Sequence, residues 1–284
     1  MPSSTTIPKI GAHVSIAGGM MNAPVRAHEE GLETFQCFTR PPQGGPAPAL
    51  TDEVIVAFES AMREAGMDRF VIHAPYCINL ASPEARIRHA SRKVIREELD
   101  RGTILGARYV MFHPGSHKDM PLETGIAAVQ KGLVEILDGY TGTTELLIEI
   151  SAGAGEILGD TFEENAQMMQ PVKKSHGFGG ICFDTCHAFA SGYDFRTTDK
   201  ARAMLDQFDR TIGLSWLKLS HVQDSKVDVG GKRDRHEHIG RGFIGNAGLQ
   251  ALLDTPPFRS IDWILETESD DRPTDIQTLQ KIRG

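Results

Sequence analysis

Cysteine is scarce in this sequence, which has four among 284 residues and no C-x-x-C pair. This scarcity excludes a dense disulfide framework and the common Cys-rich zinc motifs. No run of eighteen apolar residues is present, and residues 1–10 lack the charged and apolar regions of a signal peptide. We therefore expect a cytoplasmic protein without a membrane segment, with buried reduced thiols at Cys37, Cys77, Cys182 and Cys186.

Basic residues are fewer than acidic ones. The sequence has 30 Lys and Arg and 38 Asp and Glu, which gives a formal net charge of −8. This balance argues against a protein that holds nucleic acid through a broad basic surface, although the count omits any bound metal. The apolar fraction of 40% and charged fraction of 24% are those of an ordinary globular protein with a large core. No linker or low-complexity tract divides the chain, so we expect one domain over residues 1–284.

Short apolar runs recur along the chain, each followed by a polar segment and a stretch with helical periodicity. This pattern is typical of repeated βα units, and eight of them favour a closed (β/α)₈ TIM barrel over an open sheet. The expected strands are 10–14, 34–38, 70–73, 109–113, 146–149, 180–184, 217–221 and 263–266.

Capping residues predict where several of the connecting helices begin. Asp52 is expected to cap a helix that runs to Gly66, and Asn246 to cap a later one. Thr161 and Glu164 form a potential capping box before a helix that Pro171 interrupts. The segment 223–245 is long, irregular and rich in Gly, His and Asp, which favours a functional loop.

Six of the eight expected strands finish in a residue that commonly binds metal. A barrel gathers the carboxyl ends of its strands around one mouth, so these side chains should converge. Each one alone could be a helix cap or a core histidine, but six at equivalent positions indicate a cation site. Mixed His and carboxylate ligands without Cys favour zinc or manganese. The six are His73, His113, Glu149, Asp184, His221 and Glu266.

Three further candidate ligands lie just beyond strand ends. His187 follows Asp184 by three residues, and Asp234 and His236 project to one side if their segment is extended. These residues predict an additional metal site, although D-x-x-H and D-x-H are weak motifs on their own.

Other histidines and one cysteine near these motifs receive more ordinary interpretations. His117 and His238 are expected outside the ligand set, as supporting or substrate contacts. His13 lies inside the barrel by alternation, as a supporting contact or a core residue. Cys186 is expected to be a small buried thiol rather than a nucleophile or ligand.

Six blocks of the chain resemble the endonuclease IV family, and they occur in the same order between about residues 11 and 268. Several long blocks together are far more specific than any single motif. The blocks are GAHVSIAGG, HAPYCINLASP, FHPGSH, FDTCHAFASGYDFRT, DRHEHIGRGFIG and ILET.

The resemblance implies a xylose-isomerase-like barrel with three zinc ions. His73, His113 and Glu149 would hold the first. Glu149 would bridge to the second and act as a catalytic base that orients the attacking hydroxide. The second ion would be completed by Asp184, His221 and Glu266, and the third would be held by His187, Asp234 and His236.

The substrate that the resemblance implies is duplex DNA with an abasic site. The family cuts the backbone 5′ to that site in base excision repair and leaves 3′-hydroxyl and 5′-deoxyribose phosphate ends. Tyr76 and Arg235 are the expected DNA contacts, and a monomer is expected.

The chain departs from the family where DNA is usually gripped. After the second strand the family tends to carry Asn, Arg and Trp, whereas residues 40–45 here read RPPQGG. Cys77 stands where Leu is common, Ile150 follows Glu149, and Gln223 stands where Asn is common. A weaker or altered grip on DNA is therefore expected.

Two alternative functions remain open from the sequence. A sugar isomerase or epimerase of the same fold uses a quartet like Glu149, Asp184, His221 and Glu266 around one metal, but has no need of five further ligands. A DNA-binding protein with reduced turnover would explain the altered loop, although the intact ligands disfavour it.

Overall fold

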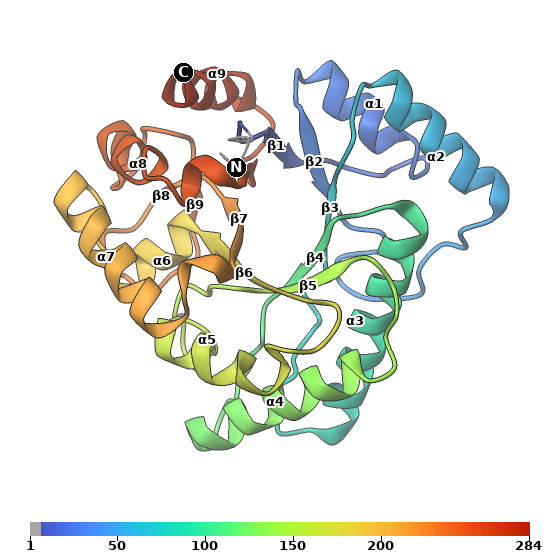
Figure 1. Ribbon diagram of the computed structural model, residues 1–284, viewed down its shortest axis with the longest axis horizontal. Coiled ribbons are helices and arrows are strands. Elements are labelled where there is room, and N and C mark those ends of the chain that lie inside the picture. Colours follow the sequence, from blue (N-terminus) through green and yellow to red (C-terminus); the bar gives the residue numbers. More distant parts are fainter. Residues whose placement is uncertain (1–6) are drawn as a thin grey trace, which may run out of the picture.

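Eight parallel strands close into a barrel in the computed structural model, which describes residues 7–284 (Figure 1). The expected polar start at residues 1–6 lies outside the described residues. The strand order around the barrel is β1-β10-β7-β6-β5-β4-β3-β2, and every neighbouring pair is parallel. The barrel strands are β1 Ile10–His13, β2 Thr34–Cys37, β3 Val71–His73, β4 Tyr109–Phe112, β5 Glu145–Glu149, β6 Phe178–Asp184, β7 Leu217–His221 and β10 Asp262–Leu265.

All eight expected strands are confirmed, with bounds that differ by at most two residues. The largest difference is at β6, which begins at Phe178, two residues before the expected start. Its pairing with β5 shifts register just after Phe178. Gly180 lies beside this shift with φ of 140°, and a Cβ there would lie 2.2 Å from the carbonyl oxygen of Trp216. Only glycine fits, so the irregular start of β6 depends on this residue.

The barrel separates two apolar cores. The inner core fills the barrel with side chains from six strands, and the outer core lies between the strands and the helices. Both faces of each strand are therefore buried, which explains the continuous apolar runs in the sequence. The inner core consists of Val71, Tyr109, Met111, Leu147, Cys182, Leu219 and Ile264.

Nine α-helices are described in residues 7–284, and most of them surround the strands in Figure 1. Three short 3₁₀ turns supplement them at Gln170–Val172, Leu214–Trp216 and Phe258–Ser260. The α-helices are α1 Asn22–Glu29, α2 Asp52–Glu64, α3 Ala85–Leu105, α4 Leu122–Leu137, α5 Phe162–Met169, α6 Thr185–Ser191, α7 Thr198–Thr211, α8 Gly245–Leu253 and α9 Arg272–Arg283.

The predicted helix caps need correction at three points. Helix α2 is capped by Thr51, whose hydroxyl accepts from the Val54 amide, so Asp52 is the first helical residue. Helix α8 begins before Asn246 and has no side-chain cap at all. Thr161 accepts from the Glu164 amide as expected, but the Glu164 carboxylate accepts from Gly159, so only half of the capping box forms.

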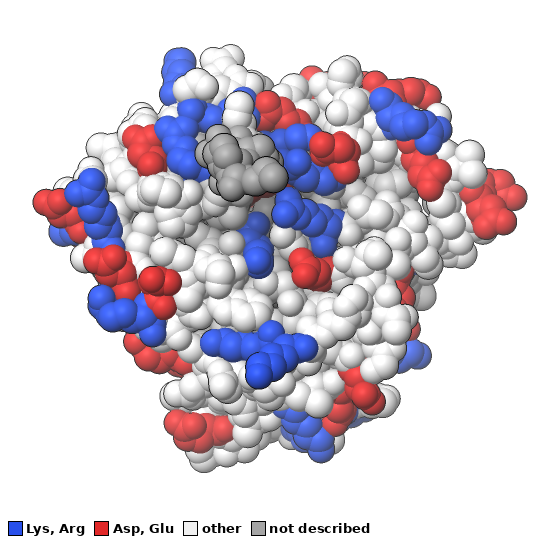
Figure 2. Space-filling model, in the orientation of Figure 1, with Lys and Arg blue, Asp and Glu red and all other residues white. Residues whose placement is uncertain are grey.

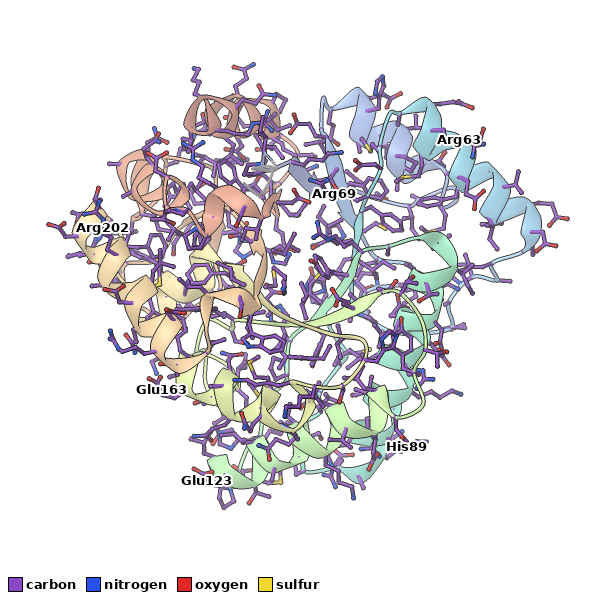
Figure 3. The ribbon with its side chains drawn as sticks, in the orientation of Figure 1. Arg63, Arg69, His89, Glu123, Glu163 and Arg202 are labelled. Atoms are coloured by element: carbon purple, nitrogen blue, oxygen red, sulfur yellow. The ribbon has the colours of Figure 1, made fainter. Side chains whose placement is uncertain are left out.

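Charged and other polar side chains lie on the outer faces of the helices. Figure 3 shows five labelled ones at the periphery, and in Figure 2 Lys and Arg alternate with Asp and Glu over the visible face. On that face no continuous basic field appears, in agreement with the acidic composition. Among residues 7–284, no helix is long and apolar enough to cross a bilayer. The five labelled side chains at the periphery of Figure 3 are those of Arg63, His89, Glu123, Glu163 and Arg202.

The long loop at residues 223–245 contains a small antiparallel hairpin outside the barrel. Its strands are β8 Asp224–Ser225 and β9 His236–Glu237. Asp224 is fully buried, and its carboxylate accepts hydrogen bonds from four backbone amides. The donors are the amides of Ser225, Gly240, Ile244 and Gly245, at 2.8 to 3.1 Å. This carboxylate therefore joins the start of the loop to its end.

Candidate metal centre

All nine predicted ligands meet at the carboxyl end of the barrel. Their ligand atoms form three groups, and within each group the atoms lie within 4.8 Å of one another. Six come from strand ends, where the parallel arrangement places them together, and three come from α6 and the long loop. The groups are His73 with His113 and Glu149; Glu149 with Asp184, His221 and Glu266; and His187 with Asp234 and His236.

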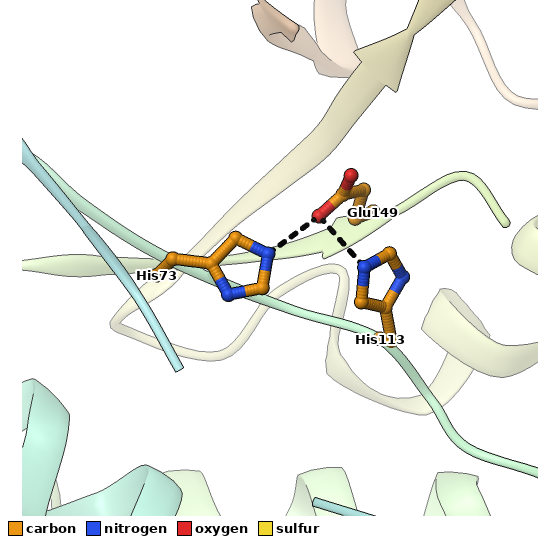
Figure 4. A group of neighbouring side chains, drawn as sticks. All are labelled: His73, His113 and Glu149. Atoms are coloured by element: carbon orange, nitrogen blue, oxygen red, sulfur yellow. Dashed lines mark hydrogen bonds and ion pairs between the residues drawn. The ribbon is translucent and has the colours of Figure 1, made fainter. Parts of the chain in front are cut away.

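Glu149 lies between the first two groups at the end of β5. Its Oε2 is 3.1 Å from Nε2 of His73 and 3.5 Å from Nε2 of His113. Figure 4 marks both contacts with dashed lines. Its Oε1 is 2.9 Å from Nδ1 of His221 and 3.4 Å from Nδ1 of His187. Each carboxylate oxygen thus faces a different pair of imidazoles, which is the geometry of a bridging ligand.

The third group combines a buried histidine with two residues of the long loop. Asp234 Oδ1 lies 3.3 Å from Nε2 of His187 and 3.2 Å from Nε2 of His236. The two Nε2 atoms are 3.4 Å apart, and Nδ1 of His187 lies 3.0 Å from the carbonyl oxygen of Ile150. Two ring nitrogens and a carboxylate oxygen therefore converge on one point.

The buried charges of this centre favour a cation. Burial opposes protonation of His187 and His221. Asp184 and its acidic neighbours nevertheless raise the pKa of His187 well above its usual value, and Cys182, Glu266 and Glu149 do the same for His221. Burial also opposes ionisation of Glu266, but His221 and its neighbours hold the pKa of that carboxyl at about 2. For His113, burial dominates and lowers the pKa to about 4. Burial raises the pKa of Asp184, whereas the histidines lower the pKa of Glu149, Asp234 and Glu266. These three carboxylates thus favour the ionised form beside nitrogens where positive charge is stabilised.

This donor set fits zinc. Each group joins imidazole nitrogens to carboxylate oxygens, both of which bind zinc readily. Asp184, Glu149 and His221 are fully buried, and such polar groups require compensating partners. A divalent cation at each group would supply the positive charge that the converging nitrogens and carboxylates favour.

Two buried glutamines orient the ligands, and neither role was predicted. Gln36 on β2 donates from Nε2 to Glu266 at 2.6 Å, and its Oε1 lies 2.8 Å from Nε2 of His221. Gln223 donates to Oδ2 of Asp184. A polar residue inside the apolar run 34–38 was a usable signal for Gln36. Gln223 stood out in the sequence only as a departure from the family.

The remaining predicted histidines lie outside the ligand set. His13 lies beside the centre, with its Nδ1 3.0 Å from Nε2 of Gln36, and burial lowers its pKa to about 4. His117 contacts the carbonyl oxygen of Met120. His238 pairs through Nδ1 with Asp275 at 2.8 Å.

The prediction of four buried thiols is wrong at one position. Cys37, Cys182 and Cys186 are buried and free, whereas Cys77 is exposed on the loop after β3. Cys186 lies near Asp184 and His236, and burial raises the pKa of its thiol to about 12. A proton-bearing thiol is a poor nucleophile, in line with its expected structural role.

The two expected DNA contacts both lie at the rim of the site. Tyr76 is 66% exposed, and its ring meets Phe38 edge-on at 5.3 Å. Arg235 is exposed and donates to the carbonyl oxygen of Asp234, next to the third group. Both side chains are therefore available to a ligand entering the mouth.

A cavity of about 430 Å³ opens beside the first and third groups. His113, His187 and Asp234 contribute to its wall, and Tyr76 lines it from the rim. Ser151 lines it as well, and its hydroxyl is buried without a hydrogen-bond partner within residues 7–284. A substrate could therefore reach the first and third groups through this cavity.

The chain matches a family described as a xylose isomerase-like TIM barrel over residues 25–283. A D-tagatose 3-epimerase-like structure, 21% identical with a TM-score of 0.70, covers 96% of both chains and shows the fold alone.

Similarity to endonuclease IV proteins is much stronger. A protein named Probable endonuclease 4 from Chlorobium phaeobacteroides is 41% identical over 260 residues, which is 91% of each chain. Another, from Chloroflexus aggregans, is 35% identical over 280 residues, or 98% of each chain. The crystal structure of endonuclease IV from Thermus thermophilus superposes with a TM-score of 0.82 at 33% identity, covering 97% of this chain and 98% of that one. The chain belongs to the endonuclease IV family.

Proposed function

We propose that this protein is a zinc-dependent DNA-repair phosphodiesterase. It would cut duplex DNA on the 5′ side of abasic sites, leaving 3′-hydroxyl and 5′-deoxyribose phosphate ends, as a step of base excision repair. The observation that carries the proposal is the position of Glu149, whose two oxygens face separate imidazole pairs at the floor of the mouth. Family membership supports the same activity.

Three zinc ions are proposed, one for each ligand group. Zinc held there would act as a Lewis acid toward a phosphoryl oxygen and would lower the pKa of water. Zinc would also make the mouth electropositive, so that an acidic chain could attract a phosphodiester.

The chain's own residues would orient the reaction. Burial opposes ionisation of Glu149, but the surrounding histidines, His113 first, hold its pKa well below the usual range. Its carboxylate is therefore ionised and positioned to accept a hydrogen bond from the attacking water. Tyr76 and Arg235 at the rim would contact the DNA, and the proposed active form is a cytoplasmic monomer.

The decisive experiment compares cleavage of a duplex containing one abasic analogue with cleavage of an undamaged duplex. We expect cleavage only beside the analogue, and Glu149→Gln should lower turnover by orders of magnitude while the protein stays folded. Cys186→Ser is the matched control and should retain most activity, because its thiol is buried and protonated. The proposal fails if neither duplex is cut, or if the Cys186 variant alone is inactive.

Metal content gives a second test that does not depend on activity. We expect elemental analysis of the purified protein to find about three zinc ions per chain. A reproducible value of one metal per chain, unaffected by replacing Asp234 and His236, would favour the isomerase or epimerase alternative. Full metal content and DNA binding without cleavage would instead identify a binding protein.

A further inference from the structure

A groove of about 530 Å³ lies between α3 and α4, which pack side by side in the ring of helices outside the strands (Figure 1). It shares no lining residue with the cavity that opens beside the first and third ligand groups. Residues three or four apart lie on one face of a helix, so one face of each helix forms a wall. The walls of this α3–α4 groove include Ala85, Arg88 and Arg92 on α3 and Ala127, Ala128 and Lys131 on α4.

Most of the lining of the α3–α4 groove is apolar. Ala85 and Ala127 are exposed, and their small side chains leave the space between the helices open. Pro83 and Met120 line the groove just before the two helices begin. Recesses that are apolar and carry a few polar groups are typical of binding sites. The groove is therefore suited to receive apolar side chains of a ligand.

The charged residues that line the groove are all basic. Arg88, Arg92 and Lys131 line it, and no carboxylate does so within residues 7–284. The carboxylate of Glu135 on α4 pairs with Nε of Arg92 at 2.6 Å and with Nζ of Lys131 at 3.8 Å. One carboxylate thus faces two of the three cations, in a chain with a formal net charge of −8. Three acidic residues adjoin the lining residues in sequence and form no ion pair with these cations, namely Glu84, Asp119 and Glu123.

Arg88 has no acidic partner within the described residues. Its Nη1 donates to the carbonyl oxygens of Ser82 and Pro83 at 2.6 and 2.9 Å, which fixes the guanidinium. Its other edge, formed by Nε and Nη2, makes no hydrogen bond within residues 7–284. Arg88 also lies in the first turn of α3, which contains no acidic residue, and a cation there opposes the helix dipole. Helix stability therefore does not explain this arginine, whereas an anionic ligand would.

We propose that the α3–α4 groove docks an acidic, partly apolar segment of a partner protein. Carboxylates of this segment would bind the free edge of Arg88 and the Lys131 ammonium, and its apolar side chains would pack against the alanines. Charge complementarity argues for this occupant, because one edge of a guanidinium donates two parallel hydrogen bonds to a carboxylate. The apolar lining argues against a nucleic-acid backbone, which has no apolar side chains to place there. The surface is separate from the proposed catalytic function, because no metal-ligand candidate lines it.

A direct test titrates the full chain with a labelled peptide of repeated Glu-Leu-Leu-Glu units and with its Gln-Leu-Leu-Gln counterpart. We expect the Gln peptide to bind at least about tenfold more weakly, because it loses hydrogen bonds between charged groups. Equal affinity for the two peptides, or no detectable association of either, overturns the proposal.

Two lysines provide a matched pair of variants. Lys131 lines the groove with its side chain 75% exposed, whereas Lys93 on α3 does not line it and is 73% exposed. Each ammonium lies 3.8 Å from a glutamate one turn further along its helix. Lys131→Glu should weaken binding of the Glu peptide at least about fivefold, with a difference that shrinks at high salt. Lys93→Glu should bind the peptide as the parent does, and equal losses in the two variants would contradict the assignment.

A second pair of variants tests the shape of the groove rather than its charge. Ala127→Trp would fill the space between the helices, whereas Ala90→Trp places the same side chain at an exposed position of α3 outside the groove. Only Ala127→Trp should weaken binding of the Glu peptide. Parent affinity in Ala127→Trp would show that the peptide binds elsewhere, and the proposal would be wrong.

Other occupants are recognised with the same variants. If Lys131→Glu weakens association with undamaged duplex but not with the Glu peptide, the groove binds DNA and the proposal is wrong. If the parent forms dimers in analytical ultracentrifugation that Lys131→Glu abolishes, the occupant is a second copy of the chain, and the proposal is equally wrong. Cleavage of the abasic duplex is measured separately and should be unchanged in Lys131→Glu, so a failure of the proposed function is recognised independently.

Discussion

Gln36 shows how a single buried amide can set the orientation of two ligands. Its side chain contacts His221 through Oε1 and Glu266 through Nε2, and it is completely buried. Contacts of this kind fix the tautomer and ring orientation of a ligating histidine. At the scale of the residue, the proposed metal centre therefore depends on more than its nine candidate ligands.

Gln36→Leu should reduce zinc retention or turnover by about 10- to 100-fold, the usual effect of losing a group that orients a metal ligand. The substitution removes a hydrogen-bond partner of both His221 and Glu266, whereas leucine has nearly the same volume as glutamine. Zinc content after dialysis and turnover on abasic duplex are the measurements. Gln130→Leu is the control, because within residues 7–284 the side chain of Gln130 bonds only to the carbonyl oxygen of Gln167, away from the centre. Equal behaviour of the two variants would contradict the role assigned to Gln36.

At the scale of the element, Asp224 connects the long loop to the third ligand group. The loop carries Asp234 and His236, and its regular structure consists of two short strands. The amides of Gly230 and Lys232 hold its middle by donating to the carbonyl oxygens of Phe189 and Ala190 on α6. The four amides bound by Asp224 replace the hydrogen bonds that a regular element would provide.

Asp224→Asn should destabilise the protein by about 1–3 kcal/mol, because an amide nitrogen would face backbone donors and leave them unpaired. It should also lower zinc content below that of the parent, since the third group depends on the loop. Thermal unfolding and elemental analysis test both effects. Asp228→Asn is the control in the same loop, where the carboxylate is 57% exposed. An Asp224 variant with parent stability and full zinc would show that the loop holds itself in place.

The loop at residues 40–45 allows a prediction about DNA recognition. Gly44 and Gly45 have φ of 102° and 118°, so a bulky side chain is strained at either position. Gln43 is exposed and has no such restriction, which makes it the better position for a stacking residue. Gln43→Trp should strengthen binding to abasic duplex relative to undamaged duplex, since stacking on a base contributes about 1–3 kcal/mol.

The quantity compared between Gln43→Trp and Gln43→Ala is the dissociation constant for undamaged duplex divided by that for abasic duplex. We expect at least about a fivefold larger ratio for Trp, which corresponds to the lower end of that stacking energy. The same ratio in both variants would show that the loop does not reach the base stack, and that recognition depends on other parts of the rim.

The elements predicted from the sequence were those with a periodic or positional signal. The strand ends at His73, Glu149 and Asp184 could be located because a fully buried apolar run stops at a polar residue. Alternation along a strand says which face a side chain occupies but not which partner it meets, so the role of Gln36 could not be derived. The hairpin closed by Asp224 depends on contacts between residues far apart in the loop, and no local pattern records them.

At the scale of the whole molecule, the barrel closes where β1 pairs with β10, near the packing of α9 against β1. An ion pair fastens this junction: Arg283 at the end of α9 binds Glu33, which precedes β2 and also accepts from the Ile10 amide at 2.9 Å. Arg283 donates in addition to the carbonyl oxygen of Pro8. The first and last described segments of the chain are thereby joined.

This junction predicts a pH dependence of stability. Burial raises the pKa of Glu33, but the hydrogen bonds from Arg283 and Ile10 outweigh it and lower the pKa below its ordinary value of 4.5. A carboxyl whose pKa is lower in the folded state stabilises the fold above its unfolded pKa, and this contribution disappears as pH falls through the folded pKa. Glu33→Gln should therefore lower the free energy of unfolding at pH 7, and the difference from the parent should shrink below about pH 4.5. The carboxylate is 39% exposed, so solvent screening limits the effect to at most about 1 kcal/mol. Urea unfolding across this pH range measures the difference. The double variant, Arg283→Gln with Glu33→Gln, tests the ion pair. Because the two side chains interact, its loss of unfolding free energy should be smaller than the sum of the losses in the two single variants. A difference that persists unchanged at pH 3 would show that Glu33 acts through packing rather than charge.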